Sequence, residues 1–175
     1  MTNASNTTVH ASAVLVGNRA VLIRGPSGTG KSRLAFDLIL AGRSGQIAEA
    51  VLVGDDRVFL DTSGGEIVVR PARELAGLIE IRGLGIRRCE FASSAVVGLV
   101  VDLAAPDAER VPPPNSLLTR IYGVQIPRIP VGATHGAFPL VVAALTTIAG
   151  SISTPLSTDC VKGNGNHMRH TIATE

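Results

Sequence analysis

Short apolar runs separated by turn-forming residues follow one another along the chain and predict a β-rich domain. The most apolar of these runs, residues 95–103, is expected to form a central, buried strand. Gly17 and Asn18 form a turn signal between two of the earlier runs and predict a hairpin. The expected strands that share this short apolar character are 9–16, 20–23, 51–54, 58–60, 67–69 and 95–103.

Two segments have the pattern of α-helices. In residues 33–41, the apolar side chains recur on one helical face, so one side of this helix is expected to be buried. Residues 137–148 are apolar almost all round, which predicts a buried C-terminal helix. A mixed sheet with helices packed outside it is the expected architecture, because hairpins interrupt the alternation of strands and helices.

The remaining segments contain glycines and prolines, which break or bend regular secondary structure. Residues 71–78 have room for one or two helical turns, and the two glycines in 79–86 indicate a bent backbone or a close approach by another group. Three consecutive prolines make 106–115 irregular, and Pro127 restricts 121–129 to a short or edge strand.

Composition narrows the class of protein. A chain of 175 residues with 45% hydrophobic content is enough for one globular domain. Lys and Arg number 16 against 14 Asp and Glu, with no basic run and 3% aromatic residues, so no nucleic-acid partner is expected. No apolar stretch reaches the roughly 18 residues of a membrane span, and the N-terminus lacks a signal-peptide pattern. We expect a cytoplasmic domain over 9–150, with residues 1–8 and 151–175 disordered.

One motif carries chemistry by itself. Eight residues between the strand at 20–23 and the helix at 33–41 have the spacing G-x-x-x-x-G-K-[ST], in which glycines fold the backbone around a phosphate and the helix N-terminus attracts its charge. Lys31 is expected to contact the β- and γ-phosphates, and the Ser32 hydroxyl is expected to bind Mg²⁺. The predicted nucleotide-binding residues of this loop are Gly25, Pro26, Ser27, Gly28, Thr29, Gly30, Lys31 and Ser32.

Acidic residues follow the next predicted strand. Asp55 and Asp56 come directly after 51–54, at the strand end where ligands bind in open α/β sheets. By themselves they would favour a surface turn or a helix cap, but the phosphate loop upstream reverses this and favours a role at the site. Asp102 also ends a buried strand, and its pattern does not decide between structure and site.

Four landmarks together give a specific resemblance: His10 about twenty residues before Lys31, the loop itself, the Asp55-Asp56-Arg57 segment, and Glu80-Ile81-Arg82-Gly83-Leu84-Gly85-Ile86. In this arrangement the chain resembles the catalytic domain of HPr kinase/phosphorylase, in a short form without the N-terminal domain. The resemblance implies the P-loop fold that this family shares with phosphoenolpyruvate carboxykinase. It implies an ATP- and Mg²⁺-dependent kinase that phosphorylates a serine of HPr, the small phosphocarrier protein of the sugar phosphotransferase system.

The resemblance also assigns roles to residues. Asp55 becomes the general base towards the serine hydroxyl, Ser32 and Glu80 hold Mg²⁺, and Lys31 binds the triphosphate. His10 and Asp56 line the site, and Arg110 falls where the family has an arginine on the transferring phosphate. A homo-oligomer, a hexamer in the family, is implied as well, although the missing domain leaves its formation open.

One departure from the family pattern bears on function. Residues 130–137 lack the Arg-Asn pair that the family associates with the phosphorolytic direction, so we expect weak or absent phosphorylase activity. Two other functions stay open: a P-loop kinase or ATPase with another substrate, and a regulatory module that binds ATP without transferring phosphate.

Overall fold

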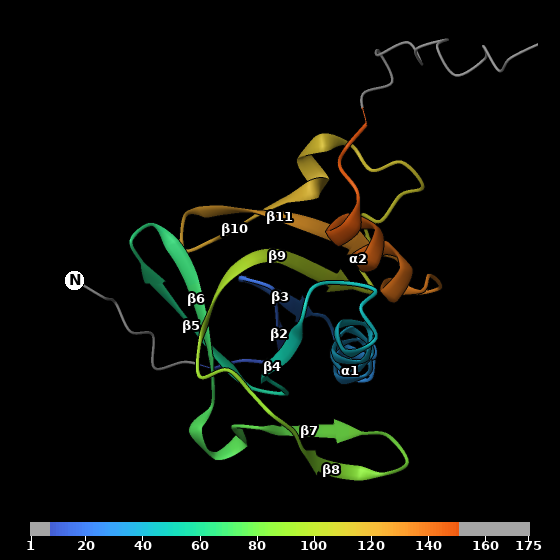
Figure 1. The fold of residues 1–175 in the computed structure, drawn as a ribbon. Coiled ribbons are helices and arrows are strands. Elements are labelled where there is room, and N and C mark those ends of the chain that lie inside the picture. The colour runs from blue at the N-terminus through green and yellow to red at the C-terminus, as the bar shows by residue number, and fades with distance from the viewer. Residues whose placement is uncertain (1–7, 151–175) are drawn as a thin grey trace, which may run out of the picture.

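The computed structural model describes residues 8–150, and its centre is a curled, mixed sheet of nine strands (Figure 1). The long strand β9 (Ala95–Leu103) is central as predicted, since it pairs with three other strands. The order along the sheet is β1 (Thr8–Val9), β5 (Val58–Ser63), β6 (Glu66–Pro71), β9, β3 (Arg19–Arg24), β2 (Ser12–Val16) and β4 (Ala50–Gly54). β11 (Val124–Val131) pairs with the second half of β9 and with β10 (Leu118–Ile121).

Four strands point in the same direction and end at the same edge of the sheet. β3 and β11 are both parallel to β9, and β4 is parallel to β3 because each is antiparallel to β2, which lies between them. The segments that follow these strands therefore meet at one edge, where open α/β sheets bind ligands. The phosphate loop after β3 and the two acids after β4 come together in this way.

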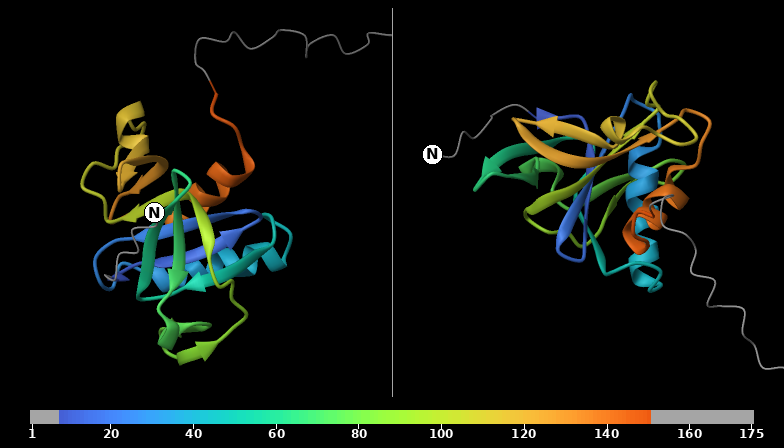
Figure 2. Two further views of the ribbon diagram at one scale, coloured as in Figure 1. Left: turned by 90° about the vertical axis from the view of Figure 1, so that its left-hand side faces the viewer. Right: turned by 90° about the horizontal axis from the view of Figure 1, so that it is seen from above.

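Both helices cover the same face of the sheet (Figures 1 and 2). Alternate residues of β3 divide between two apolar clusters: Val21 and Ile23 pack with α1 (Lys31–Arg43) and α2 (Ala137–Thr146), whereas Leu22 packs with residues of β5, β6 and β11. The expectation of helices outside the sheet is correct for one face only. On the other face the sheet curls onto itself, because the β5–β6 hairpin and the β10–β11 hairpin supply the apolar cover.

The prediction of a buried C-terminal helix is wrong. α2 ends at Thr146, only Val141 is buried, and Leu140 is 43% exposed. The helix packs along one side against α1 and β11, so its other side stays open despite its apolar sequence.

Several local predictions also change in the structure. The first expected strand is split into β1 and β2 by a bend at His10, because β1 pairs with β5 whereas β2 pairs with β3. Thr8, which was expected to be disordered, belongs to β1. The other residues expected to be disordered, 1–7 and 151–175, lie outside the described residues. β11 continues through Pro127 over eight residues instead of breaking there, since its two halves pair with different strands.

The other glycine- and proline-rich segments form short elements. Two 3₁₀ turns, η1 (Arg73–Leu75) and η2 (Pro114–Leu117), lie in segments expected to be a helical turn and irregular, respectively. The bend expected in 79–86 is the turn of a separate hairpin of β7 (Leu78–Ile81) and β8 (Gly85–Arg88). Within residues 8–150, no helix has the length and apolarity needed to cross a membrane.

Candidate functional site

The phosphate loop has the geometry of an anion cradle. Gly28 and Gly30 have positive φ angles of 81° and 95°, and a Cβ built on either residue would meet no atom within 4 Å. Gly30 begins α1 without a side-chain cap, and the first turn of the helix holds no acidic residue. The N–H groups at a helix start need acceptors, and here a phosphate fits that requirement.

Gly25 fixes the base of this loop against the sheet. Its φ is +145°, and an added Cβ would lie 2.8 Å from the carbonyl oxygen of Leu103, at the end of β9. Glycine is therefore required at this position both by the backbone conformation and by the close approach of the neighbouring strand.

Lys31 is folded back over the loop that it follows. Its Nζ donates hydrogen bonds of 2.9 and 3.0 Å to the carbonyl oxygens of Gly25 and Pro26, and the residue is buried. An ammonium group has three N–H donors, so one remains for a phosphate. Burial lowers the pKa of Lys31, while the negative charges of Asp55 and Asp56 act in the opposite direction.

Asp55 is a buried carboxylate that joins three elements. Its Oδ1 accepts hydrogen bonds from the hydroxyls of Ser12 at 2.5 Å and Ser32 at 2.9 Å. Its Oδ2 accepts the backbone N–H of Glu80 at 3.2 Å, and Asp55 is only 3% exposed. Both carboxylate oxygens are thus occupied by donors from β2, α1 and β7.

Asp56 has the opposite environment. Its side chain is 61% exposed, and Oδ1 lies 3.2 Å from Nε2 of His10. Its φ is +64°, and the N–H of Arg57 bonds to the carbonyl oxygen of Asp55 at 2.8 Å, so Asp56 is the middle residue of a three-residue turn. Positive φ in such a tight turn is strained, and strain of this kind concentrates at functional sites.

The two predicted metal ligands, Ser32 and Glu80, are brought together by Asp55. Ser32 and Glu80 contact the same carboxylate, one through its hydroxyl and the other through its N–H. The Ser32 oxygen keeps lone pairs, and the exposed Glu80 side chain makes no ion pair or hydrogen bond with another described residue. Over residues 8–150 no group of three or more His, Cys, Asp or Glu side chains forms a metal cluster. One hydroxyl and one carboxylate nevertheless fit Mg²⁺, which keeps several waters.

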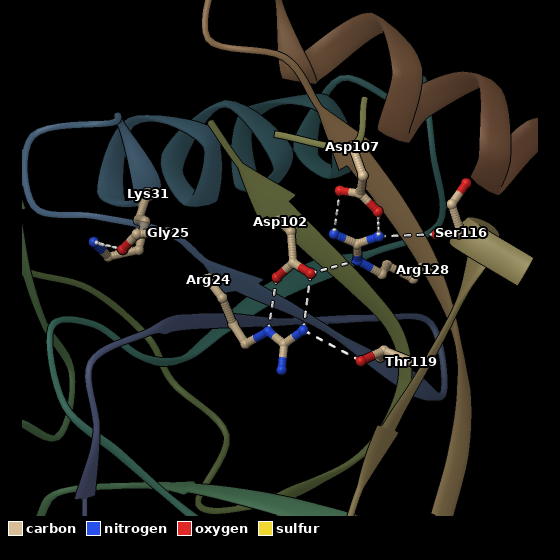
Figure 3. A network of polar contacts seen from close by, with 8 residues as sticks. All are labelled: Arg24, Gly25, Lys31, Asp102, Asp107, Ser116, Thr119 and Arg128. Carbon is tan, nitrogen blue, oxygen red and sulfur yellow. Dashed lines mark hydrogen bonds and ion pairs between the residues drawn. The ribbon is translucent and has the colours of Figure 1, made fainter. Parts of the chain in front are cut away.

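Arg110 is not part of this arrangement of contacts. It is exposed in the segment after β9, with no ion pair to any described side chain. Two other arginines instead meet at the end of β9 (Figure 3). Arg24 binds Asp102 through two hydrogen bonds of 2.7 and 2.8 Å, and Nε of Arg128 binds the same carboxylate at 2.5 Å.

The sequence patterns missed Ser12, Arg24 and Arg128, and left Asp102 undecided. Their partners are far apart in the chain: Arg24 and Asp102 are separated by 78 positions, and Ser12 and Asp55 by 43. One available signal was the position of Arg24 and Asp102 at the ends of two apolar strands. Such ends are where polar side chains gather in parallel sheets.

Comparison with known proteins decides the family. The family profile described as HPr Serine kinase C-terminal domain matches residues 2–149. The chain belongs to this family. Among solved structures, the HPr(Ser) kinase/phosphatase from Coxiella burnetii aligns with a TM-score of 0.63 and 26% identity, covering 80% of this chain and 93% of that one.

Curated relatives agree with this assignment. HPr kinase/phosphorylase of Enterococcus faecalis is 35% identical over 144 residues, and that of Geobacillus thermodenitrificans 33% over 144 residues. Each alignment covers 76% of this chain and 44% of the relative. The protein of Mycoplasma mycoides is 40% identical over 77 residues, 44% of this chain and 22% of the relative. The chain thus spans less than half the length of these relatives.

Proposed function

We propose that this domain is an ATP-dependent kinase that phosphorylates a serine of HPr. The observation that carries the proposal is the pair of acids beside the phosphate loop. Asp55 is buried and accepts the Ser32 hydroxyl, whereas Asp56 is exposed, has a strained backbone and lies 3.2 Å from Nε2 of His10. Membership of the HPr serine kinase C-terminal domain family supports the choice of substrate.

Nucleotide binding would use the loop and the first turn of α1. Phosphate oxygens would accept hydrogen bonds from loop N–H groups and from the one N–H of Lys31 that the loop carbonyls leave free. Ser32 and Glu80 would hold Mg²⁺, which supplies neutralisation of phosphate charge when bound. Asp55 would keep the Ser32 hydroxyl oriented through the 2.9 Å hydrogen bond.

We assign the proton acceptor to Asp56 in preference to Asp55, the residue to which the family resemblance assigns this role. A carboxylate that is 3% exposed and already accepts three hydrogen bonds is a poor acceptor for a serine on another protein. Asp56 is accessible, and His10 orients its carboxylate at 3.2 Å. In the transfer step, the serine oxygen bonds to the γ-phosphorus, its proton passes to Asp56, and the bond between γ-phosphorus and the ADP oxygen breaks.

Other parts of the proposal rest on sequence and family. Arg110 as a contact of the transferring phosphate, assembly into a homo-oligomer and a cytoplasmic location remain predictions. Weak or absent phosphorolysis is also proposed, because residues 130–137 lack the Arg-Asn pair.

Two alternatives make different demands on the site. A P-loop kinase or ATPase for another substrate needs the same acids, so only the acceptor distinguishes it. A module that senses ATP without transfer has no need of an exposed carboxylate in a strained turn, and the geometry of Asp56 argues against it.

The test is incubation with Mg·ATP and purified HPr, followed by intact-mass measurement of HPr. We expect the gain of one phosphate on serine, lost in Lys31→Ala and Asp56→Asn. Phosphate transfer to another protein but not to HPr would support the first alternative. Binding of ATP without transfer to any protein would support the second.

A further inference from the structure

A polar cleft of about 490 Å³ opens beside the phosphate loop, at the carboxyl ends of β3 and β9 and along the middle of β11. Arg24, which lines the cleft, directly precedes Gly25, so cleft and loop share one strand end (Figure 3). The predicted roles for the loop and the two acids do not use this cleft.

The wall between the cleft and the sheet is a preorganised network of ion pairs. Asp102 joins Arg24 and Arg128, and Arg128 also binds Asp107 through hydrogen bonds of 2.6 and 3.0 Å. Burial acts to raise the pKa of Asp102, but hydrogen bonds from both arginines outweigh it and lower that pKa. The same arginines are therefore already neutralised by carboxylates.

The net charge of the lining excludes an anion as the ligand. Two arginines face three carboxylates once Glu109 is included, and neither arginine lacks an acid partner. A second phosphate group would meet excess negative charge here. The accessible oxygens instead suit hydroxyl and amino donors.

Other lining residues supply complementary features for a ring system. Pro113 and Leu118 contribute apolar surface, and Leu118 is 42% exposed. Asn115 also lines the cleft, and its side-chain amide can both donate and accept hydrogen bonds. An apolar surface with a few convergent polar groups is typical of small-molecule sites. Acidic side chains commonly accept hydrogen bonds from ribose hydroxyls.

The order of strands in the sheet indicates which end of a bound nucleotide would face the cleft. Asp55 and Asp56 follow β4, which is separated from β3 by β2, whereas the cleft lies on the other side of β3, at β9 and β11. A nucleotide whose γ-phosphate faces Asp56 therefore has its nucleoside towards the cleft.

We propose that this cleft binds the ribose and base of the nucleotide whose phosphates occupy the loop. The carboxylates of Asp107 and Glu109 accept from the ribose hydroxyls, and the base packs on Pro113 and Leu118. The proposal rests on the proposed function, because it takes the phosphates to lie in the loop.

Calorimetric titration with two probes, Mg·ATP and Mg·tripolyphosphate, separates the cleft from the loop. In Glu109→Ala and Leu118→Asp, we expect ATP affinity to fall about tenfold or more while tripolyphosphate affinity stays unchanged. Leu40→Asp is the matched control, since Leu40 is 45% exposed near the end of α1, close to the 42% of Leu118, and does not line the cleft. Asn115→Ala, at an exposed position, is the second variant if Leu118→Asp fails to fold.

Three outcomes have distinct meanings. Unchanged ATP affinity in folded Glu109→Ala and Leu118→Asp overturns the cleft assignment and leaves the kinase proposal standing. Equal losses for ATP and tripolyphosphate also overturn it, because the effect would then lie in the loop. Failure of the wild-type protein to bind either probe overturns the proposed function itself.

Discussion

The Ser32 hydroxyl donates a 2.9 Å hydrogen bond to Oδ1 of Asp55, which links the end of the phosphate loop to the end of β4. The same oxygen accepts the hydroxyl of Ser12 at 2.5 Å, and the other accepts the Glu80 N–H. Three donors therefore hold this buried carboxylate in place, and our proposal gives Asp55 the role of a positioning group. The neighbouring acid, Asp56, is the one left accessible to a substrate.

Asn substitutions at the two acids should therefore have different consequences. Asp55→Asn puts an amide donor among donors from Ser12, Ser32 and Glu80, so we expect a loss of roughly 1–3 kcal/mol in the free energy of unfolding. Asp56→Asn should change stability by less than about 0.5 kcal/mol, because the site is exposed and Asn tolerates positive φ. It should nevertheless lower the rate of phosphate transfer by about 10²–10⁴-fold, the usual effect of losing a general base.

Urea denaturation and single-turnover transfer measure these two effects separately. Glu66→Gln is a control for charge loss, because Glu66 is about half exposed in a surface ion pair with Arg19. Asp55→Asn with wild-type stability, or Asp56→Asn with wild-type transfer, would contradict the division of roles.

The ion-pair network at the end of β9 predicts an acid-dependent loss of stability. The pKa values of Asp102 and Asp107 are both lowered from the ordinary value of 3.8, in each case by hydrogen bonds from Arg128 among other causes. The unfolded chain consequently binds more protons near that pH, so this stabilisation is present above it and is lost as pH falls through the folded pKa values. Arg128→Met should be less stable near neutral pH and lose less stability on acidification.

Thermal unfolding followed from about pH 6 to about pH 3 measures this dependence. Arg33→Met serves as the control, because Arg33 is 81% exposed in a helical surface pair with Asp37. If the stability of Arg128→Met falls as steeply with acidification as that of the wild type, other groups cause the acid-dependent loss of stability.

The contact between Gly25 and β9 predicts a position at which alanine is not tolerated. In Gly25→Ala the new Cβ would lie 2.8 Å from the Leu103 carbonyl oxygen, so the loop must shift and nucleotide affinity should fall by at least about tenfold. Gly65→Ala also has positive φ, 80°, but no atom within 4 Å of its Cβ, and should bind ATP normally. Calorimetric titration with Mg·ATP compares the two. Equal affinities would mean that Gly25 does not shape the loop.

Loss of the Arg-Asn pair in residues 130–137 predicts a one-directional enzyme. With serine-phosphorylated HPr and inorganic phosphate, we expect little or no pyrophosphate and little or no phosphate-free HPr. Pyrophosphate release can be followed by ³¹P NMR spectroscopy. Brisk release would contradict the prediction and restore phosphorylase activity to the proposal.

The sequence predicted the features that are local in the chain. The loop from Gly25 to Ser32 lies between a strand and a helix, and the two acids follow β4, because contiguous motifs carry their own geometry. The central position of β9 also followed from its uninterrupted apolar run.

The rest depended on tertiary contacts that no local pattern contains. The opposite environments of Asp55 and Asp56 arise from Ser12, 43 positions away from Asp55, and from the turn that gives Asp56 its positive φ. Arg128 joins Asp102 across 26 positions through strand pairing. The exposure of α2 likewise depends on how little of the helix its neighbours cover.

Transfer of label from ATP to HPr tests the central claim most directly. HPr is incubated with the domain, Mg²⁺ and ATP carrying ³³P at the γ-position, with α-labelled ATP as the parallel control. We expect one γ-phosphate per HPr, on serine, no label from the α-position, and no transfer by Lys31→Ala. Label that appears only as inorganic phosphate, or that stays on ATP, would contradict a protein-serine kinase.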